Sequence, residues 1–261
     1  MFFKILVVCI MAQKKHARTR HKAKTTKKRA KKTPRYRVLC ICSKQEFPAK
    51  KKHLLAHSFV QSVERVDPVY LTNSAKDREL ASHLQTAPIT KPKSRLRKMG
   101  CILAHMHALK KAVQKKYDHI LILEEDAELS HRLPKPPRVS CYMGGWIVPK
   151  NISETGKTHI SIPSLSTGLQ TINYDVFKII MSHAYYLRSD DARAIVDTLQ
   201  QAFQATKPPG KIRNYDVFLA EHKFMKHFYY PERFVQGKHV STIDGKVNQN
   251  DLHTQSYGLK K

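Results

Sequence analysis

Apolar positions along the middle of the chain follow two periodicities, and these predict strands and helices that alternate. The runs at 35–43 and 119–123 are apolar and partly β-branched, which predicts two strands. Between them, apolar residues from Met99 to Val113 recur at helical spacing and form one stripe. Ile120–Leu123 is apolar at every position, a pattern typical of a central parallel strand covered by helices on both faces. The pattern therefore predicts an α/β fold with a doubly wound sheet.

The same reasoning extends along the rest of the chain. Helices are predicted at 50–64, 74–85, 190–203 and 214–225, strands at 67–72, 139–149 and 178–189, and an extended segment at 226–235. The strand at 139–149 is expected to end at Gly144 and Gly145. The chain then divides into an apolar start with a basic tail (1–34), one domain (35–240) and a polar C-terminal tail (241–261).

The N-terminal segment differs from the rest of the chain in its high positive charge. The 261 residues include 48 Lys and Arg against 20 Asp and Glu, a formal net charge of +28. Residues 1–37 contain fourteen of these cations and no acid. A segment so poor in large apolar residues is predicted to be disordered and attracted to polyanions such as nucleic acid or anionic lipid. We expect polyanion contact through residues 14–37; the alternative is a solubilising arm that binds nothing specific.

The apolar start and the cysteines bear on location. After Lys4, about eight apolar residues precede the next charge, fewer than the ~20 that a membrane-spanning helix needs, so no transmembrane span is expected. The five cysteines are odd in number and include no C-x-x-C, which argues against a disulfide framework and a cysteine-based zinc site. Free thiols predict a cytoplasmic protein, either free, peripheral at a membrane, or packaged in a particle through the basic tail.

Acids are scarce in this chain, yet Glu124, Glu125 and Asp126 directly follow the most apolar strand. Ligands of open α/β sheets bind at the carboxyl ends of the strands. In an extended chain Glu124, Asp126 and Glu128 share one side, while Glu125 points to the other. Such oxygen ligands hold Mg²⁺ or Mn²⁺ beside nucleotide phosphates. The alternative is a solvated strand end that caps a helix or pairs with nearby lysines.

Four motifs in order resemble glycosyltransferase family 25, the family of lipooligosaccharide and collagen galactosyltransferases. The first, a helix followed by the acidic strand, matches at Gly100, Cys101, Ala104, His105, Leu123, Glu124, Glu125 and Asp126; the family usually has Asp where this chain has Glu125. Further along, "SHAYYLRSDDARAIVD", "YDVFLAE" and "YYPERFVQ" are similar to its later motifs, with Asp216, Pro231, Val235 and Gln236 at matching positions. The similarity spans roughly residues 36–236, but is poor between 132 and 173, where an acceptor would bind.

The resemblance implies a single Rossmann-like domain of the GT-A type that transfers a hexose, galactose or glucose, from a UDP-sugar to an acceptor hydroxyl with inversion. It also implies Mn²⁺ or Mg²⁺ held by Asp126 with Glu124 or Glu125. The acceptor is a glycan, a lipid-linked or a protein hydroxyl. Inversion in one step needs a base for the hydroxyl proton. Asp216 is the first candidate, with Glu128 and Glu221 as rivals; the alternative for Asp216 is a helix N-terminal acid.

Other residues carry two interpretations each. His105 either contacts the donor or acceptor, as the family pattern implies, or packs at the edge of the helix stripe. Gly144 and Gly145 either border the donor or allow close backbone approach. Trp146 either stacks on a sugar ring or belongs to the core, and Cys101 is expected to be structural.

A second function of another class remains open from the sequence. The tail, the net charge and Glu125 in place of Asp also fit a catalytically degenerate transferase fold that acts as a basic nucleic-acid-binding or packaged structural protein. That hypothesis predicts salt-sensitive nucleic-acid binding. A nucleotidyl or phosphoryl transferase is a third interpretation, although the chain has no Walker-type glycine loop and no kinase signature.

Overall fold

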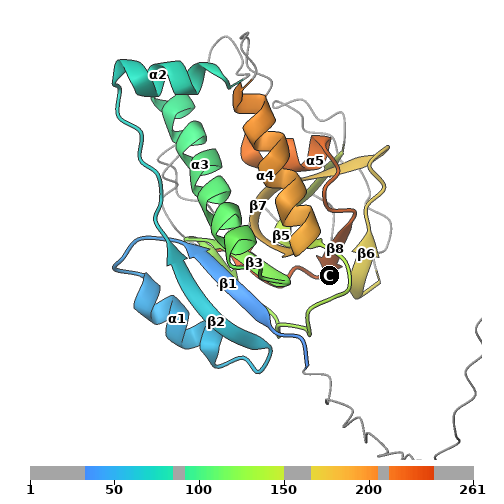
Figure 1. Ribbon diagram of the computed structural model, residues 1–261. Coiled ribbons are helices and arrows are strands. Elements are labelled where there is room, and N and C mark those ends of the chain that lie inside the picture. Colours follow the sequence, from blue (N-terminus) through green and yellow to red (C-terminus); the bar gives the residue numbers. More distant parts are fainter. Residues whose placement is uncertain (1–32, 85–91, 150–165, 205–211, 238–261) are drawn as a thin grey trace, which may run out of the picture. The chain divides into compact units, whose positions relative to one another are not determined.

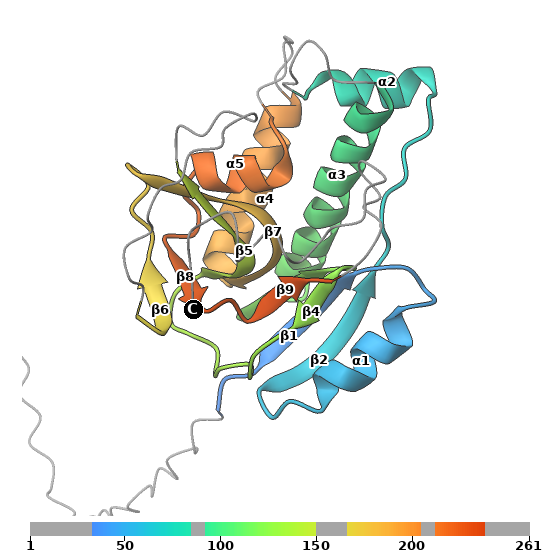
Figure 2. The ribbon, with the colours of Figure 1, turned by 180° about the vertical axis from the view of Figure 1, so that it is seen from behind.

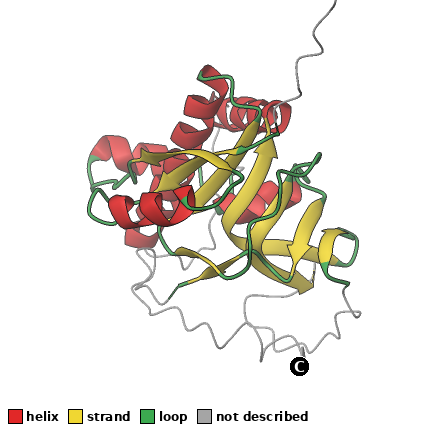
Figure 3. Ribbon diagram, turned by 90° about the horizontal axis from the view of Figure 1, so that it is seen from below, coloured by secondary structure: helices red, strands yellow, loops and turns green. Residues whose placement is uncertain are grey.

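A seven-stranded mixed sheet organises the computed structural model, which describes residues 33–84, 92–149, 166–204 and 212–237 (Figure 1). Its strands are β1 (Tyr36–Ile41), β2 (Val60–Val66), β3 (His119–Glu124), β5 (Cys141–Pro149), β6 (Gly168–Thr171), β7 (Phe177–Arg188) and β8 (His227–Tyr230). They lie in the order β2-β1-β3-β7-β5-β8-β6 and twist together, as the view in Figure 3 shows. β4 (Ala127–Leu129) and β9 (Phe234–Gln236) form a separate antiparallel pair.

The helices are α1 (Phe47–Leu55), α2 (Ala75–Ser82), α3 (Pro92–Gln114), α4 (Ser189–Gln204) and α5 (Tyr215–Glu221). β2, β1 and β3 run parallel, whereas β7 runs antiparallel to both β3 and β5. The α/β class is therefore confirmed, but the sheet is mixed. Because β2 and β3 lie on opposite sides of β1, the chain leaves β1 in one direction and later crosses to its other side. Such a reversal creates a crevice beyond the carboxyl ends of the strands.

β3 is buried on both faces, as its unbroken apolar run predicts. Ile120 and Ile122 belong to the core cluster that includes the apolar stripe of α3 and the buried side of α4. Leu121 and Leu123 belong to a second cluster, with Leu54 of α1. Figure 2 shows β4 and β9 lying over this second face beside β1. The core thus consists of two apolar layers, one on each side of the sheet.

Two predicted elements between β1 and α2 are wrong. The helix expected at 50–64 ends at Leu55, and Val60–Val66 forms β2 instead. The valines at 60, 63 and 66 have helix-like spacing, but β-branched residues favour strands and here they pair with β1. The strand expected at 67–72 is a loop. β5 also continues through Gly144 and Gly145 to Pro149 rather than ending there.

The other predicted elements are found, but the helix expected at 214–225 ends at Glu221 and the extended segment expected at 226–235 forms two short strands, β8 and β9. Ser74 caps α2 by accepting a hydrogen bond from the backbone N–H of Asp77 at 3.2 Å. The chain divides between Thr33 and Pro34, and every helix and strand given above belongs to the part that begins at Pro34. The polar tail at 241–261 and the basic residues before 33 lie outside the described residues. No helix in the described ranges has the length and apolar character required to cross a bilayer.

Candidate functional site

A cavity of about 870 Å³ lies at the carboxyl ends of β1 and β3. Ile41 and Glu124, the last residues of these strands, are register partners and both line it. The loop 68–73 forms another wall, and one side of α3 from Pro92 to His105 completes the lining. The cavity therefore occupies the crevice that the strand order creates.

Glu124 and Glu125 lie at this cavity because β3 ends at Glu124, whereas Asp126 is not among the residues that line it. Glu125 and Asp126 form a turn before β4 begins at Ala127, so the side-chain alternation expected through Glu128 does not hold. Glu124 and Glu125 both line the cavity. The turn thus brings to one site two carboxylates that a continued strand would have directed to opposite faces.

Asp126 is fixed by the C-terminal strand β9. Its Oδ2 accepts a hydrogen bond from Gln236 Nε2 at 2.6 Å, and its backbone carbonyl accepts one from the N–H of Gly237 at 2.7 Å. Its Oδ1 is buried and has no hydrogen-bond partner among the residues that the structure describes. A buried carboxylate oxygen without a partner is costly, so this atom is suited to bind a cation.

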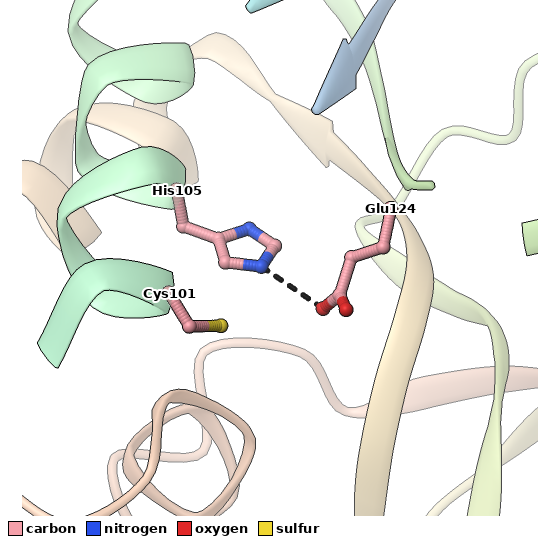
Figure 4. Close-up of side chains that lie close together, drawn as sticks. All are labelled: Cys101, His105 and Glu124. Carbon is pink, nitrogen blue, oxygen red and sulfur yellow. Dashed lines mark hydrogen bonds and ion pairs between the residues drawn. The ribbon is translucent and has the colours of Figure 1, made fainter. Parts of the chain in front are cut away.

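A buried hydrogen-bonded chain orients Glu124 (Figure 4). The two ring nitrogens of His105 contact Glu124 Oε1, at 3.0 Å from Nε2, and Tyr185 Oη, at 2.8 Å from Nδ1. Tyr185 Oη in turn lies 2.9 Å from Tyr215 Oη, and the Tyr215 ring stacks on the imidazole at 4.1 Å. His105 is 1% exposed. It is therefore both a packed residue, as one interpretation expected, and a direct contact of an acid in the cavity.

Glu125 has a raised pKa. Burial is the first cause, and Glu46, which is hydrogen-bonded to Glu125, and Asp126 also raise the pKa to about 7, whereas Lys50 opposes the shift. Glu46 stands at the N-cap position of α1. Two carboxyl groups in contact retain one proton because two adjacent negative charges repel. A cation bound at this edge would replace that proton.

The pKa of the Cys101 thiol reflects the negative charge around the cavity. Burial raises the pKa of its thiol, and the negative charges of Glu124, Asp216 and Asp126 raise it further. The charges of these three acids therefore reach the thiol, although the acids come from β3, its following turn and α5. Asp216, in the first turn of α5, accepts a hydrogen bond from the N–H of Val217 at 2.8 Å. This contact agrees with its interpretation as a helix N-terminal acid and leaves its second oxygen to other contacts.

Several sequence-predicted site residues lie elsewhere. Glu128 is exposed on β4 and lines a second cavity of about 370 Å³ with Lys50. Gly144 lies inside β5, where an added Cβ would come within 2.4 Å of His183 Nε2, so this glycine permits close packing. Gly145, also in β5, has φ 138° and does not line the larger cavity. Glu221 forms an ion pair with Arg213 at 3.0 Å.

The structure adds site residues that the sequence did not single out. Tyr70 is 71% exposed at the wall of the larger cavity, in the loop expected to be a strand. Lys93 and Arg97 line the same cavity from α3. Glu46 also belongs to the site, because it is hydrogen-bonded to Glu125. Pro68, which interrupts the expected strand, was the one local signal for the Tyr70 loop.

Comparison with models of known protein families gives no match to this chain. No curated protein matches its sequence either. What is established is an α/β fold with an acid-lined cavity at the strand-order reversal of a mixed sheet. Its function therefore has to be inferred from the residues of that cavity.

Proposed function

We propose that the chain is a metal-dependent glycosyltransferase of the Rossmann-like GT-A type, which moves a hexose from a UDP-sugar to an acceptor hydroxyl with inversion. The observation that carries the proposal is the buried Oδ1 of Asp126, which has no partner among the described residues and follows directly in sequence on Glu124 and Glu125, two acids that line the cavity. Clustered carboxylates at this position are explained if they bind a cation that in turn binds a diphosphate. The family resemblance of the surrounding motifs names the same acids.

Carboxylate oxygens of the kind that a hard divalent cation binds come together in sequence at the end of β3. Asp126 offers an oxygen that lacks a partner, and Glu124 offers an oxygen oriented by His105. Glu125 supplies a third oxygen once its proton leaves. When bound, Mn²⁺ or Mg²⁺ supplies positive charge that stabilises the diphosphate leaving group. The longer side chain of Glu125, where the family has Asp, places its oxygen one methylene further from the backbone.

The rest of the cavity fits a nucleotide. Its volume lies in the range of about 300–1,000 Å³ that is typical of small-molecule sites. Lys93 and Arg97 on α3 bring positive charge to a cavity whose other end is acidic. Tyr70 offers an exposed aromatic face at the wall. In this arrangement the cations attract the phosphates and the aromatic ring contacts the base or sugar.

Transfer with inversion forms one bond and breaks one. The acceptor oxygen attacks the anomeric carbon, the bond from that carbon to the diphosphate oxygen breaks, and the hydroxyl proton passes to a base. Asp216 is the best of the three candidate bases because its charge acts on Cys101, which lines the cavity, whereas Glu221 is paired with Arg213. Glu128 lines the smaller cavity instead. The acceptor is a glycan, a lipid-linked or a protein hydroxyl.

A thermal-shift experiment tests the donor site. The full chain is melted with UDP, GDP, CMP or ADP, each with and without Mn²⁺, because a ligand that binds only the native state raises the melting temperature. We expect UDP to raise it only with Mn²⁺, Asp126→Asn to abolish the rise, and Glu128→Gln, a matched acid at the other cavity, to retain it. UDP release from UDP-galactose and UDP-glucose then identifies the donor.

A flat response to every nucleotide, or an equal rise in Asp126→Asn, would contradict this assignment. The degenerate, polyanion-binding alternative would then be favoured. It predicts salt-dependent DNA or RNA binding by the same preparation without nucleotide-sugar hydrolysis.

A further inference from the structure

Cys101, His105 and Glu124 form a second arrangement of ligands in the larger cavity. Cys101 and His105 are four residues apart on α3 and project from the same side of the helix, facing Glu124 at the end of β3 (Figure 4). The ligand atoms of the three residues all lie within 4.8 Å of one another. In a tetrahedral zinc site with the usual bond lengths, such atoms lie about 3.3–3.6 Å apart. Small side-chain movements therefore suffice to surround an ion.

The surroundings of His105 are those of a metal ligand. A metal-bound imidazole usually donates its other N–H to an oxygen, which fixes the ring orientation. Nδ1 lies 2.8 Å from Tyr185 Oη, and that hydroxyl is 2.9 Å from Tyr215 Oη, to which it can donate its own proton. Stacking on Tyr215 holds the ring plane. Nε2 is consequently directed at Glu124, where an ion would lie.

Access and ligand type narrow the choice of ion. All three residues line the cavity, so the cavity has room for a fourth ligand beside them. Three protein ligands and one open position are typical of catalytic rather than structural zinc sites. A thiolate with an imidazole selects Zn²⁺ and similar borderline-soft ions over Mg²⁺, Mn²⁺ and Ca²⁺. Spacing among the cysteines alone does not reveal this set, because only one of its ligands is a cysteine.

We propose that Cys101, His105 and Glu124 bind a zinc-type divalent ion with an open fourth position towards the cavity. Binding breaks the S–H bond of Cys101, forms a metal–sulfur bond and releases the proton to solvent. The site stands independently of the proposed transferase activity. If that activity is present, zinc inhibits it, because the ion occupies Glu124, which the Mn²⁺ or Mg²⁺ site also needs.

Cobalt absorption tests the site directly. The full chain, first treated with a chelator, is titrated with Co²⁺, which takes zinc sites and gives a thiolate-to-cobalt charge-transfer band. We expect one equivalent to produce this band, Zn²⁺ to remove it, and a large excess of Mg²⁺ to leave it unchanged. Cys101→Ala should lose the band, whereas Cys42→Ala and Cys9→Ser, which alter thiols outside the set, should keep it.

Two further measurements test the site without the Cys101→Ala variant. Tyr185→Phe removes the hydroxyl that holds Nδ1 and should weaken zinc affinity about 10–100-fold, as loss of such a partner does elsewhere. X-ray absorption of the wild-type zinc complex should show one sulfur at about 2.3 Å with nitrogen and oxygen ligands. Zinc without a sulfur neighbour, or a cobalt band that persists in Cys101→Ala, overturns the proposal, whatever the outcome with UDP and Mn²⁺.

Discussion

Gln236 donates a hydrogen bond to one oxygen of Asp126 at 2.6 Å, although 110 residues separate the two in the chain. The contact fixes the carboxylate so that its other oxygen, Oδ1, stays buried without a partner among the described residues. β9 and β4 are paired at this point, with Gln236 opposite Ala127. The last strand of the domain thus positions an acid that follows β3.

The first prediction concerns this positioning. Gln236→Leu should retain the fold but lower the affinity for Mn²⁺ about 10–100-fold, because the carboxylate loses the partner that orients it. Manganese binding to the full chain, measured by electron paramagnetic resonance, checks this. Gln61→Leu on β2 is the matched control, since Gln61 is exposed and lies outside the cavity. Unchanged manganese affinity in Gln236→Leu would mean that the contact serves the fold alone.

The second prediction concerns the wall of the cavity at Gly100. A Cβ added there would lie 2.2 Å from the carbonyl oxygen of Val69, so α3 and the loop 68–73 approach as closely as backbone allows. Gly100→Ala should lower the free energy of unfolding by about 1–3 kcal/mol, since overpacking outweighs the better helix propensity of alanine. Urea unfolding measures the change. His107→Ala, at an exposed position of the same helix, should have little effect.

The same substitution should also weaken nucleotide binding. Relief of the clash moves the loop that carries Tyr70, and both Gly100 and Tyr70 line the cavity. Normal stability and normal nucleotide affinity in Gly100→Ala would show that the loop moves aside without cost, which would exclude Gly100 as a determinant of the cavity.

Local periodicity explains which parts of the fold the sequence could predict. α3 and β3 were found because each has a long, regular apolar pattern that local sequence determines. β2 was missed because its valines recur every three residues, and the pairing with β1 that makes it a strand is not local. The antiparallel course of β7 beside β3 likewise depends on chain reversal through distant segments.

In the candidate site, too, local sequence predicts some features and not others. Glu124, Glu125 and Asp126 were predictable because they are consecutive and follow a buried strand. The contacts that give each acid its character come from far along the chain: Gln236 for Asp126, and Glu46 for Glu125. No local pattern encodes such contacts.

The third prediction concerns the pH dependence of stability that arises from the ion pairs between Glu64 on β2 and the lysines at the end of α3. Burial of Glu64 opposes ionisation, but the hydrogen bonds from Lys115, Tyr117 and Lys111 outweigh it and lower the pKa from 4.5 to about 2. The ammonium groups of Lys111 and Lys115 lie 3.0 and 2.7 Å from Glu64 Oε2. Because the folded state lowers this pKa, the contribution of Glu64 is complete above about pH 4.5. It is lost as the pH falls towards 2.

Glu64→Gln should therefore reduce the free energy of unfolding at pH 7 by about 1 kcal/mol, with allowance for solvent screening. The difference from wild type should shrink between pH 4.5 and 2. Urea unfolding across this pH range measures it, with Glu79→Gln, an exposed acid of α2, as the control. A difference that stays constant with pH would exclude the ion pairs as its cause.

The fourth prediction concerns the basic N-terminal segment. Deletion of residues 1–34 removes twelve Lys and Arg and no acid, so the formal net charge falls from +28 to +16. The shorter chain should bind DNA more weakly, with a shallower dependence of affinity on salt, because fewer counterions are released. Fluorescence anisotropy at several salt concentrations checks this. Equal affinity and slope in both chains would assign polyanion binding to the domain rather than the segment.

The fifth prediction concerns Tyr70, whose ring is 71% exposed although it stands at the wall of a cavity. An exposed aromatic ring contributes little to the stability of the fold, but it stabilises a complex when a base or sugar stacks on it. Tyr70→Ala should weaken UDP binding by about 1–3 kcal/mol, the usual effect of losing one stacking ring. Calorimetric titration with UDP and Mn²⁺ gives this value.

Tyr70→Phe separates stacking from hydrogen bonding, because it keeps the ring and removes the hydroxyl. We expect affinity close to wild type in Tyr70→Phe, and no change of melting temperature without ligand in either variant, since the exposed ring contributes little to the core. If Tyr70→Phe loses as much affinity as Tyr70→Ala, the hydroxyl rather than the ring contacts the nucleotide. If neither variant changes UDP affinity, the nucleotide lies away from this wall, nearer to Lys93 and Arg97.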